Sequence, residues 1–370
     1  MDTVQCEMVR TDVDAIIANA REGISGAHIF MDFCKDELRP IEKVMACETR
    51  MISAAPLDYT VAWRMYFGAF GAAMMEYHTI SGMAPGICVY SEWGILADFI
   101  SEKGEKVFDG DFKRFDASEL PDVHNALLDY INWWYNDGEE NALIRKVLWR
   151  ELTHSRHIGG EGTDQRYIYQ WNKSLPSGHP FTTIVNSMYS LTCIVGCYIK
   201  LTNDEMGFWN NVRAVTYGDD NLVNPGRMSS VFNQVTVAET MGDLFKVVYT
   251  SGKKDGTLEP FSSLSEVTFL KRRFLKKVVD NTTYWAAPLE LDSFLYTSYW
   301  CKNRKMEHDI TYDVLVNALI ELSLHEEDVW LYRAPMVRAV LEEWYPGKYC
   351  IRPCQRRHLA IAMRRTDMWF

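Results

Sequence analysis

Two short β-prone runs flank an acidic turn near the middle of the chain. Residues 212–217 alternate in polarity, Gly218 and Asp219 follow, and residues 220–224 are again β-prone. A two-residue connection with glycine first, where a positive φ is needed, predicts a tight β-hairpin. Its exposed tip would hold Asp219 and Asp220 close together, and Mg²⁺ is bound by one or two such carboxylates plus substrate phosphates. Taken alone, however, this sequence is more often simply a turn.

A second acidic segment follows a short apolar run. Residues 106–108 are predicted to form a buried strand that ends in Asp109-Gly110-Asp111. Asp111 could complete a metal site with the hairpin carboxylates, and Asp116 could contact a substrate at the same strand-to-helix corner. The alternative for Asp116, or for Ser118, is to cap the helix that follows.

A third segment combines a turn with small polar side chains. Pro176-Ser177-Gly178 predicts the turn, and Thr182 and Asn186 then lie four residues apart on one helical face. Hydroxyl and amide groups in this arrangement can recognise a sugar hydroxyl and distinguish ribose from deoxyribose. Alternatively, both groups are bonded internally within a core helix.

The remaining pattern predicts a mixed α+β chain with antiparallel pairing. Helices are expected at 57–79, 92–103, 120–135, 140–156, 178–200, 227–242 and from 290 onward, and strands at 212–217, 220–224, 245–249 and as a pair around 267–285. Nine scattered cysteines do not suggest a disulfide framework, and the apolar run 188–199 is shorter than the ~20 residues of a spanning helix. We therefore expect a soluble protein from a reducing compartment, without a transmembrane segment.

Total charge argues against a polyanionic ligand. The chain has 39 Lys+Arg against 50 Asp+Glu, a net charge of −11, whereas phosphate contacts need positive potential. The positive charge is nevertheless clustered: residues 271–277 hold five basic side chains, and residues 352–365 hold five arginines and no acid. We expect a basic channel inside an acidic shell.

These segments together resemble an ordered motif set. Asp111-x4-Asp116, then Ser177-Gly178 with Thr182 and Asn186, then Tyr217-Gly218-Asp219-Asp220 are similar to motifs A, B and C of the RNA-dependent RNA polymerases of picorna-like positive-strand RNA viruses. Residues 249–254 occupy the place of motif D, residues 268–272 are similar to motif E, and residues 35–39 with 49–52 are similar to motif F.

The resemblance implies a right-hand polymerase of α+β class that copies RNA with Mg²⁺ or Mn²⁺. It implies fingers at 1–66 and 150–172, a palm at 67–149 and 173–282, and a thumb at 283–370. The implied partners are an RNA template with its primer or product strand, NTPs, a viral protein primer and other replication proteins. The implied location is the host cytoplasm, in replication complexes that associate with membranes through partners.

The resemblance also assigns roles to individual residues. Asp111 and Asp219 would bind the metal ions with help from Asp220, and Lys254, or its neighbour Lys253, would be the general acid. The ribose would be recognised by Asp116 and Asn186, with Ser177, Gly178 and Thr182. The triphosphate would be held by Lys35, Arg39 and Arg50, and Lys271 and Arg272 would lie near the primer.

Two departures from the family pattern are visible. Glu48 stands where a basic residue usually precedes the Thr-Arg of motif F, and motif F begins within the first 50 residues. We expect shortened or truncated fingers, and with them a weaker fingers-to-thumb bridge. The rival hypothesis is a palm-fold fragment that binds RNA or proteins without turnover. A reverse transcriptase is disfavoured by Asn186 and by the Phe-Leu-Lys-Arg segment 269–272.

Other candidate sites are weaker. Cys350, Cys354 and His358 share a helical spacing but lack the fourth ligand of a structural zinc site, and His154 and His157 with Cys193 and Cys197 have the same weakness. The aromatic clusters at 133–135 and 330–332 are expected to pack in the core.

Overall fold

The computed structural model describes residues 3–113, 115–160, 165–173, 175–253, 256–279, 281–299, 301 and 304–347. Its helices are α1 (Thr3–Arg21), α2 (Ile41–Met45), α3 (Leu57–Glu76), α4 (Trp93–Ser101), α5 (Phe115–Ser118), α6 (Pro121–Tyr135), α7 (Glu139–Thr153), α8 (Thr182–Thr202), α9 (Phe208–Asn211), α10 (Gln234–Phe245), α11 (Leu291–Leu295), α12 (Glu307–Leu322) and α13 (Glu327–Trp344). Its strands are β1 (Ile29–Cys34), β2 (Met51–Ala54), β3 (Phe108–Lys113), β4 (Arg156–Gly159), β5 (Tyr167–Gln170), β6 (Arg213–Tyr217), β7 (Asp220–Asn224), β8 (Val248–Thr250), β9 (Thr268–Phe269), β10 (Arg272–Arg273), β11 (Leu275–Val279) and β12 (Thr282–Ala286).

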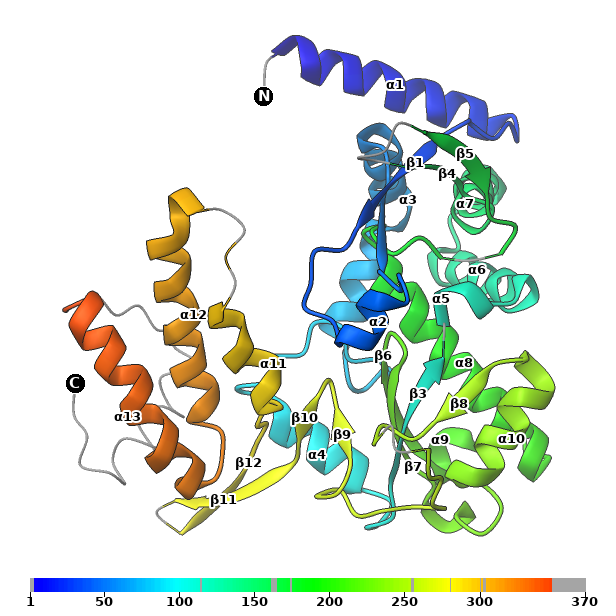
Figure 1. Ribbon diagram of the computed structural model, residues 1–370. Helices are drawn as coiled ribbons and strands as arrows, with labels where there is room; N and C mark the ends of the chain where they lie inside the picture. Colours follow the sequence, from blue (N-terminus) through cyan, green and yellow to red (C-terminus); the bar gives the residue numbers. More distant parts are fainter. Residues whose placement is uncertain are drawn as a thin grey trace.

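A four-stranded antiparallel sheet lies at the centre of the molecule, in the order β6-β7-β3-β8 (Figure 1). Its faces are both covered, because alternate side chains of each strand enter different cores. Ala214 and Val223 join the large cluster beneath α8 and α10, whereas Val215 and Leu222 pack with α4. The sheet is therefore a rigid support for whatever its strand ends carry.

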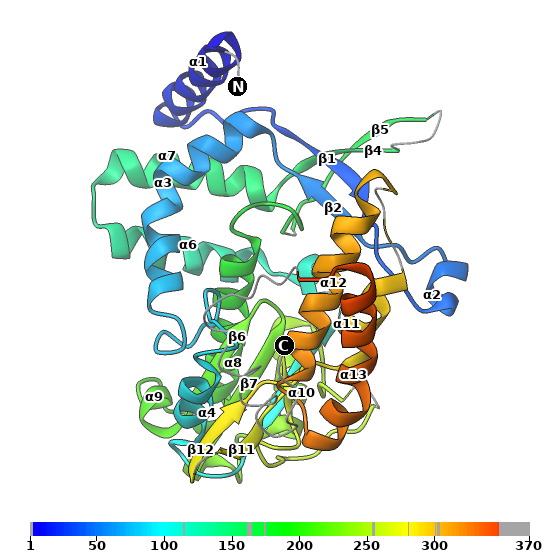
Figure 2. The same cartoon turned by 90° about the vertical axis from the view of Figure 1, so that its left-hand side faces the viewer.

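A second sheet, in the order β2-β1-β4-β5, lies at the end of the molecule that also holds α1, α3 and α7 (Figures 1 and 2). Here β1 pairs with β4 in parallel, and the other pairs are antiparallel. Helices α12 and α13 build a separate core around Leu319, Trp330 and Leu341. In Figure 1 these two helices lie beside the sheets.

Most predicted elements are confirmed, with shifted ends. Strand β3 continues to Lys113, so Asp111 lies within a strand rather than at its end. Helix α8 starts at Thr182 instead of 178, and α10 starts at Gln234 because Asn233 forms a capping box there. Neither Asp116 nor Ser118 caps α6, whose N-cap is Leu120.

Helix α8 is longer than the apolar run in the sequence suggested. It is the one helix in the described part of the chain that is long and apolar enough to cross a membrane. Of its most apolar window, 61% is buried inside the protein, as in the core helix of a globular domain.

The prediction that the aromatic clusters pack in the core is only partly confirmed. Trp330 is buried in the C-terminal core, but Leu331 and Tyr332 are exposed. Trp133 is 73% exposed and Trp134 is 37% exposed, so the prediction that residues 133–135 pack in the core is wrong for these two side chains. Trp133 projects from the face of α6 opposite to Leu127, Leu128 and Ile131. Trp134, near the end of α6, packs edge-on against Phe70 but stays partly exposed.

Candidate active site on the central sheet

The acidic turn is a hairpin tip, as predicted. Strands β6 and β7 pair up to Tyr217 and Asp220, and Gly218 adopts a φ of +64° in the turn. The Gly218 N–H donates a 2.8 Å hydrogen bond to Ser187 Oγ, so α8 holds the turn from below. Asp219 is exposed at the tip. Ser187 was not singled out in the sequence, because a buried serine on a helix gives no signal of this contact.

Asp111 lies on the strand next to this hairpin. Gly110 pairs with Asn221, and the register therefore carries Asp111 beside Asp220. Asn221 strengthens the junction: its Nδ2 donates to Gly110 O at 3.1 Å, and its Oδ1 accepts from Tyr249 OH at 2.6 Å. Three carboxylates predicted from two separate motifs are thus presented by β3 and by the tip of the neighbouring hairpin.

The donors in this group are oxygen atoms, which suit a hard divalent cation. Among the described residues, no three His, Cys, Asp or Glu side chains form a ready-made metal cluster. Mg²⁺ does not require one, because it is bound by one or two carboxylates and completes its shell with waters and substrate phosphates. The residues present therefore fit Mg²⁺ or Mn²⁺.

Asp116 and Asn186 meet beside this group. Asn186 Nδ2 donates a 2.8 Å hydrogen bond to Asp116 Oδ1, while the Asp116 carbonyl accepts from Leu175 N at 3.2 Å. Burial raises the pKa of Asp116, although the bond from Asn186 and the charge of Arg50 oppose this. Asn186 Oδ1 is buried and has no hydrogen-bond partner among the described residues, so one acceptor remains in this pair.

The residues predicted to bind the ribose in and after the loop before α8 have different contacts. Thr182 Oγ1 donates to Pro176 O at 2.8 Å and to His179 O at 2.9 Å, which is the internal bonding that the sequence left open as an alternative. Ser177 is exposed, and its carbonyl accepts from Ser53 N at 3.0 Å. A Cβ on Gly178 would lie 2.6 Å from Ser53 O, so glycine allows this loop to dock on β2.

The three predicted triphosphate-binding residues share one internal carboxylate. Arg50 Nε donates to Glu37 Oε1 at 2.7 Å and its Nη2 contacts the other oxygen, while Lys35 Nζ lies 3.6 Å and Arg39 Nη1 3.5 Å from Glu37. The hydrogen bond from Arg50 is the main cause that lowers the pKa of Glu37. Glu37 is an acidic residue within a basic segment of the sequence, but its pairing with these three cations was not predicted.

Arg50 also faces the acidic site. Its pKa is raised, first by the bond to Glu37 and further by the charges of Asp219 and Asp116. The fields of both carboxylates therefore reach the guanidinium. Residues from motifs A, C and F, far apart in the sequence, lie within electrostatic reach of each other.

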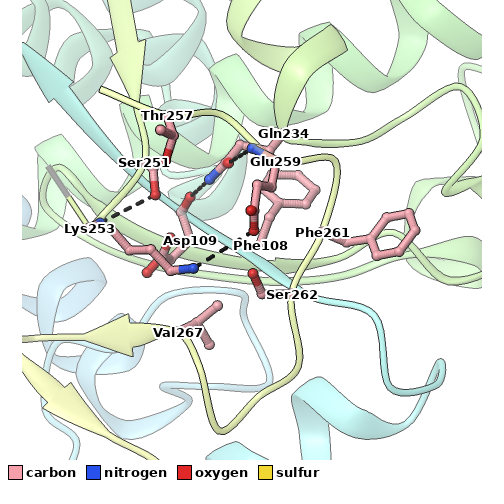
Figure 3. Close-up of a pocket in the computed structure, with 10 residues that line it drawn as sticks. All are labelled: Phe108, Asp109, Gln234, Ser251, Lys253, Thr257, Glu259, Phe261, Ser262 and Val267. Atoms are coloured by element: carbon pink, nitrogen blue, oxygen red, sulfur yellow. Dashed lines mark hydrogen bonds and ion pairs between the residues drawn. The ribbon is translucent and has the colours of Figure 1, made fainter. Parts of the chain in front are cut away.

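A small pocket beside β3 is lined by Asp109 (Figure 3). Its carboxylate accepts the Gly252 N–H at 3.2 Å and the Thr268 N–H at 3.0 Å, and Gln234 Nε2 donates to its backbone carbonyl at 2.6 Å. Burial raises the pKa of this carboxyl. Asp109 therefore ties β3 to the loop after β8 and to β9. Lys254 lies outside the described residues, and the adjacent Lys253 has its Nζ 3.8 Å from Glu259 Oε2.

The basic run 271–277 differs from the prediction. Arg272 is buried, and its two Nη atoms donate to the Glu321 carboxylate at 2.8 and 2.9 Å. Arg273 pairs with Glu326, and Lys277 donates to Ser323 O at 3.0 Å. Much of this charge therefore joins β10 and β11 to α12, α13 and the turn between these helices instead of facing an RNA channel. Lys271 is exposed, and its predicted contact with the primer stays a prediction.

The contacts of the weaker candidate zinc ligands do not support a zinc site among the described residues. His157 is buried between Asp32 Oδ1 at 2.9 Å and Ser155 Oγ at 2.7 Å, and burial raises the pKa of both the Cys193 and Cys197 thiols. Protonated core thiols do not bind zinc. The prediction at Cys350, Cys354 and His358, like the arginines of 352–365, lies outside the described residues.

An antiparallel palm-type sheet with acids on a central hairpin, flanked by a second sheet and a helical unit, defines the right-hand polymerase class, and comparisons with known proteins agree. The solved Sicinivirus 3Dpol RNA-dependent RNA polymerase superposes with a TM-score of 0.76 at 22% identity, covering 96% of this chain and 71% of that one.

The family model described as viral RNA-dependent RNA polymerase matches residues 1–334, and the chain belongs to that family. It is 35% identical over 339 residues to the replicase polyprotein of Cricket paralysis virus, covering 87% of this chain and 19% of the polyprotein. It is 34% identical to the replicase polyprotein of Acute bee paralysis virus, covering 85% of this chain and 17% of the polyprotein. The chain spans about a fifth of the length of these curated relatives.

Proposed function

We propose that this chain synthesises RNA from NTPs on an RNA template and so replicates a viral RNA genome. The observation that carries the proposal is the grouping of Asp111 with the Asp219-Asp220 tip, within electrostatic reach of Arg50. Carboxylates for a cation beside an arginine for phosphate oxygens are what nucleotidyl transfer requires.

The residues of this site divide the work. Asp111, Asp219 and Asp220 would hold Mg²⁺ or Mn²⁺, which when bound lowers the pKa of the primer 3′-hydroxyl and offsets the triphosphate charge. Arg50 would bind the triphosphate, because Glu37 engages its Nε and Nη2 and leaves Nη1 for a phosphate oxygen. The Asp116–Asn186 pair would bond the ribose 2′-hydroxyl.

The family membership supports further proposals about partners. The substrates would be NTPs and an RNA template with its primer, and the relatives are named as replicase polyproteins, which fits additional replication proteins and a viral protein primer. RNA synthesis would take place in the host cytoplasm, in membrane-associated complexes formed through those partners. The division into fingers, palm and thumb at the predicted boundaries is part of the same proposal.

Primer extension on an RNA template with Mg²⁺ tests this function. The native chain should incorporate ribonucleotides, Asp219→Ala should abolish incorporation, and Asp243→Ala, which removes an exposed carboxylate from α10, should leave it unchanged. Equal incorporation by the native chain and Asp219→Ala would reject the proposal. RNA binding without incorporation by any of the three proteins would favour the rival function, a palm-fold binding fragment.

A further inference from the structure

A second polar cavity lies at the far end of the molecule from the hairpin tip. Its volume is about 230 Å³, and its walls come from the turn after α1, the end of α7, the start of β4 and the end of β5. Figures 1 and 2 both show these elements near α1, away from β6 and β7. The residues of the candidate active site do not line it.

The cavity is rich in positive charge although the whole chain carries −11. Its walls include four basic side chains, namely His28, Arg150, His154 and Arg156. Glu151 is the one acidic residue among those that line it. The cavity therefore has a local charge opposite to that of the chain as a whole.

That single carboxylate is already engaged. Glu151 Oε1 accepts the Gly26 N–H at 2.6 Å, and Glu151 Oε2 lies 2.5 Å from His28 Nδ1. Burial lowers the pKa of His28, but the bond and charge of Glu151 outweigh it, so the net shift is upward. Glu151 is thus paired with His28, and among the described residues it forms no ion pair with Arg150 or Arg156.

The two arginines keep most of their donors. Both are exposed, and neither forms an ion pair within the described ranges. Arg156 Nη1 makes one long contact, 3.4 Å to Gly26 O. Ser25 and Gln170 add a hydroxyl and an amide to the same wall. The cavity therefore presents many donors and few acceptors.

We propose that this cavity binds a phosphate group, supplied either by the RNA backbone or by a nucleotide. Guanidinium groups donate pairs of hydrogen bonds that match phosphate oxygens, and a phosphate has enough oxygen atoms to accept from both arginines. The volume accommodates a phosphate and an attached sugar but not a duplex. The inference does not rest on the proposed polymerase activity.

Phosphate binding is measured by calorimetry and by thermal unfolding of the full chain, at constant ionic strength and in EDTA, which suppresses cation-dependent nucleotide binding on the central sheet. Inorganic phosphate should stabilise the native chain. In Arg150→Ala/Arg156→Ala the Kd should rise about tenfold or more, the loss expected for a charge-assisted pair. The control Lys146→Ala/Lys200→Ala removes the same charge from exposed helical positions outside the cavity and should bind as the native chain does.

Competition then identifies the source of the phosphate. Displacement by a short single-stranded RNA indicates the backbone, and displacement by a nucleoside monophosphate alone indicates a nucleotide. If Arg150→Ala/Arg156→Ala does not fold, Arg156→Gln replaces it, since it keeps side-chain length and removes only the charge and fork. Absence of phosphate binding to the native chain, or equal binding by the arginine variant and the lysine control, would overturn the proposal.

Discussion

Asn186 Nδ2 donates a 2.8 Å hydrogen bond to Asp116 Oδ1 across 70 positions of sequence, and it leaves its own buried Oδ1 unpaired among the described residues. The bond joins α8 to the short helix α5 beside the hairpin tip. Two residues that the sequence predicted to act together are therefore in direct contact.

Asn186→Ala should reduce discrimination between ribonucleotides and 2′-deoxyribonucleotides. Loss of one hydrogen bond to a hydroxyl costs about 0.5–1.5 kcal/mol, so the ratio of the two kcat/KM values should fall roughly two- to tenfold. Ser190→Ala, at a buried hydroxyl one turn further along α8, is the control and should keep the ratio. An unchanged ratio in Asn186→Ala would remove this pair from ribose recognition.

Glu37→Gln should raise the KM for NTPs about tenfold with little change in kcat, because Arg50 loses the partner that orients its fork. Steady-state kinetics of primer extension measure both constants. Glu48→Gln is the matched control, since it removes the same charge from the same segment but does not pair with Arg50 through its side chain. A lower KM in Glu37→Gln would mean that Glu37 competes with the triphosphate instead.

Asp109→Asn should loosen the loop after β8. The carboxylate accepts two N–H groups, whereas an asparagine accepts one and turns a donor toward the other, and an unpaired buried donor costs about 1–3 kcal/mol. Hydrogen exchange at Gly252 or Thr268 should accelerate accordingly. The control is Asp204→Asn, which alters a carboxylate that accepts the Met206 and Gly207 N–H groups. It should leave hydrogen exchange at Gly252 and Thr268 unchanged.

Arg272→Ala should lower the free energy of unfolding by about 3–5 kcal/mol, because it leaves Glu321 as an uncompensated buried charge. Denaturant unfolding measures this loss. The double variant Arg272→Met/Glu321→Leu should recover most of it, since neither charge is then buried. Arg273→Ala breaks an exposed pair with Glu326 and should cost less than about 1 kcal/mol. Equal losses for both arginines would contradict this ranking.

His179 should destabilise the protein in acid. Burial lowers its pKa to about 3, from an ordinary 6.5, so its contribution to stability is complete above pH 6.5 and is lost as the pH falls toward the folded-state pKa. His179→Leu should flatten the pH dependence of the unfolding free energy between pH 6.5 and 4, by up to about 1.4 kcal/mol per pH unit. A pH dependence that is the same in His179→Leu as in the native chain would contradict this prediction.

Elements that depend on neighbours in sequence could be predicted. The Gly218-Asp219 turn, the Asn136 stop of α6 and the strands on either side of the tip follow from local φ/ψ preferences and period-two patterning. That Asp111 could share a metal site with the hairpin carboxylates was suggested by the residue types and again by the family resemblance, and the strand register places them side by side. The strand pairing itself, across more than 100 residues, has no local signal in the sequence.

The partners of charged side chains could not be predicted. By itself the sequence determined the positions of Lys35, Arg50 and Arg272 along the chain and the clustering of basic residues around them. Only the tertiary structure decided that Glu37 holds Arg50 and that Glu321, 49 positions away, buries Arg272. A guanidinium bonds whichever carboxylate the fold brings within about 3 Å, so its role depends on long-range packing and not on its own surroundings in the chain.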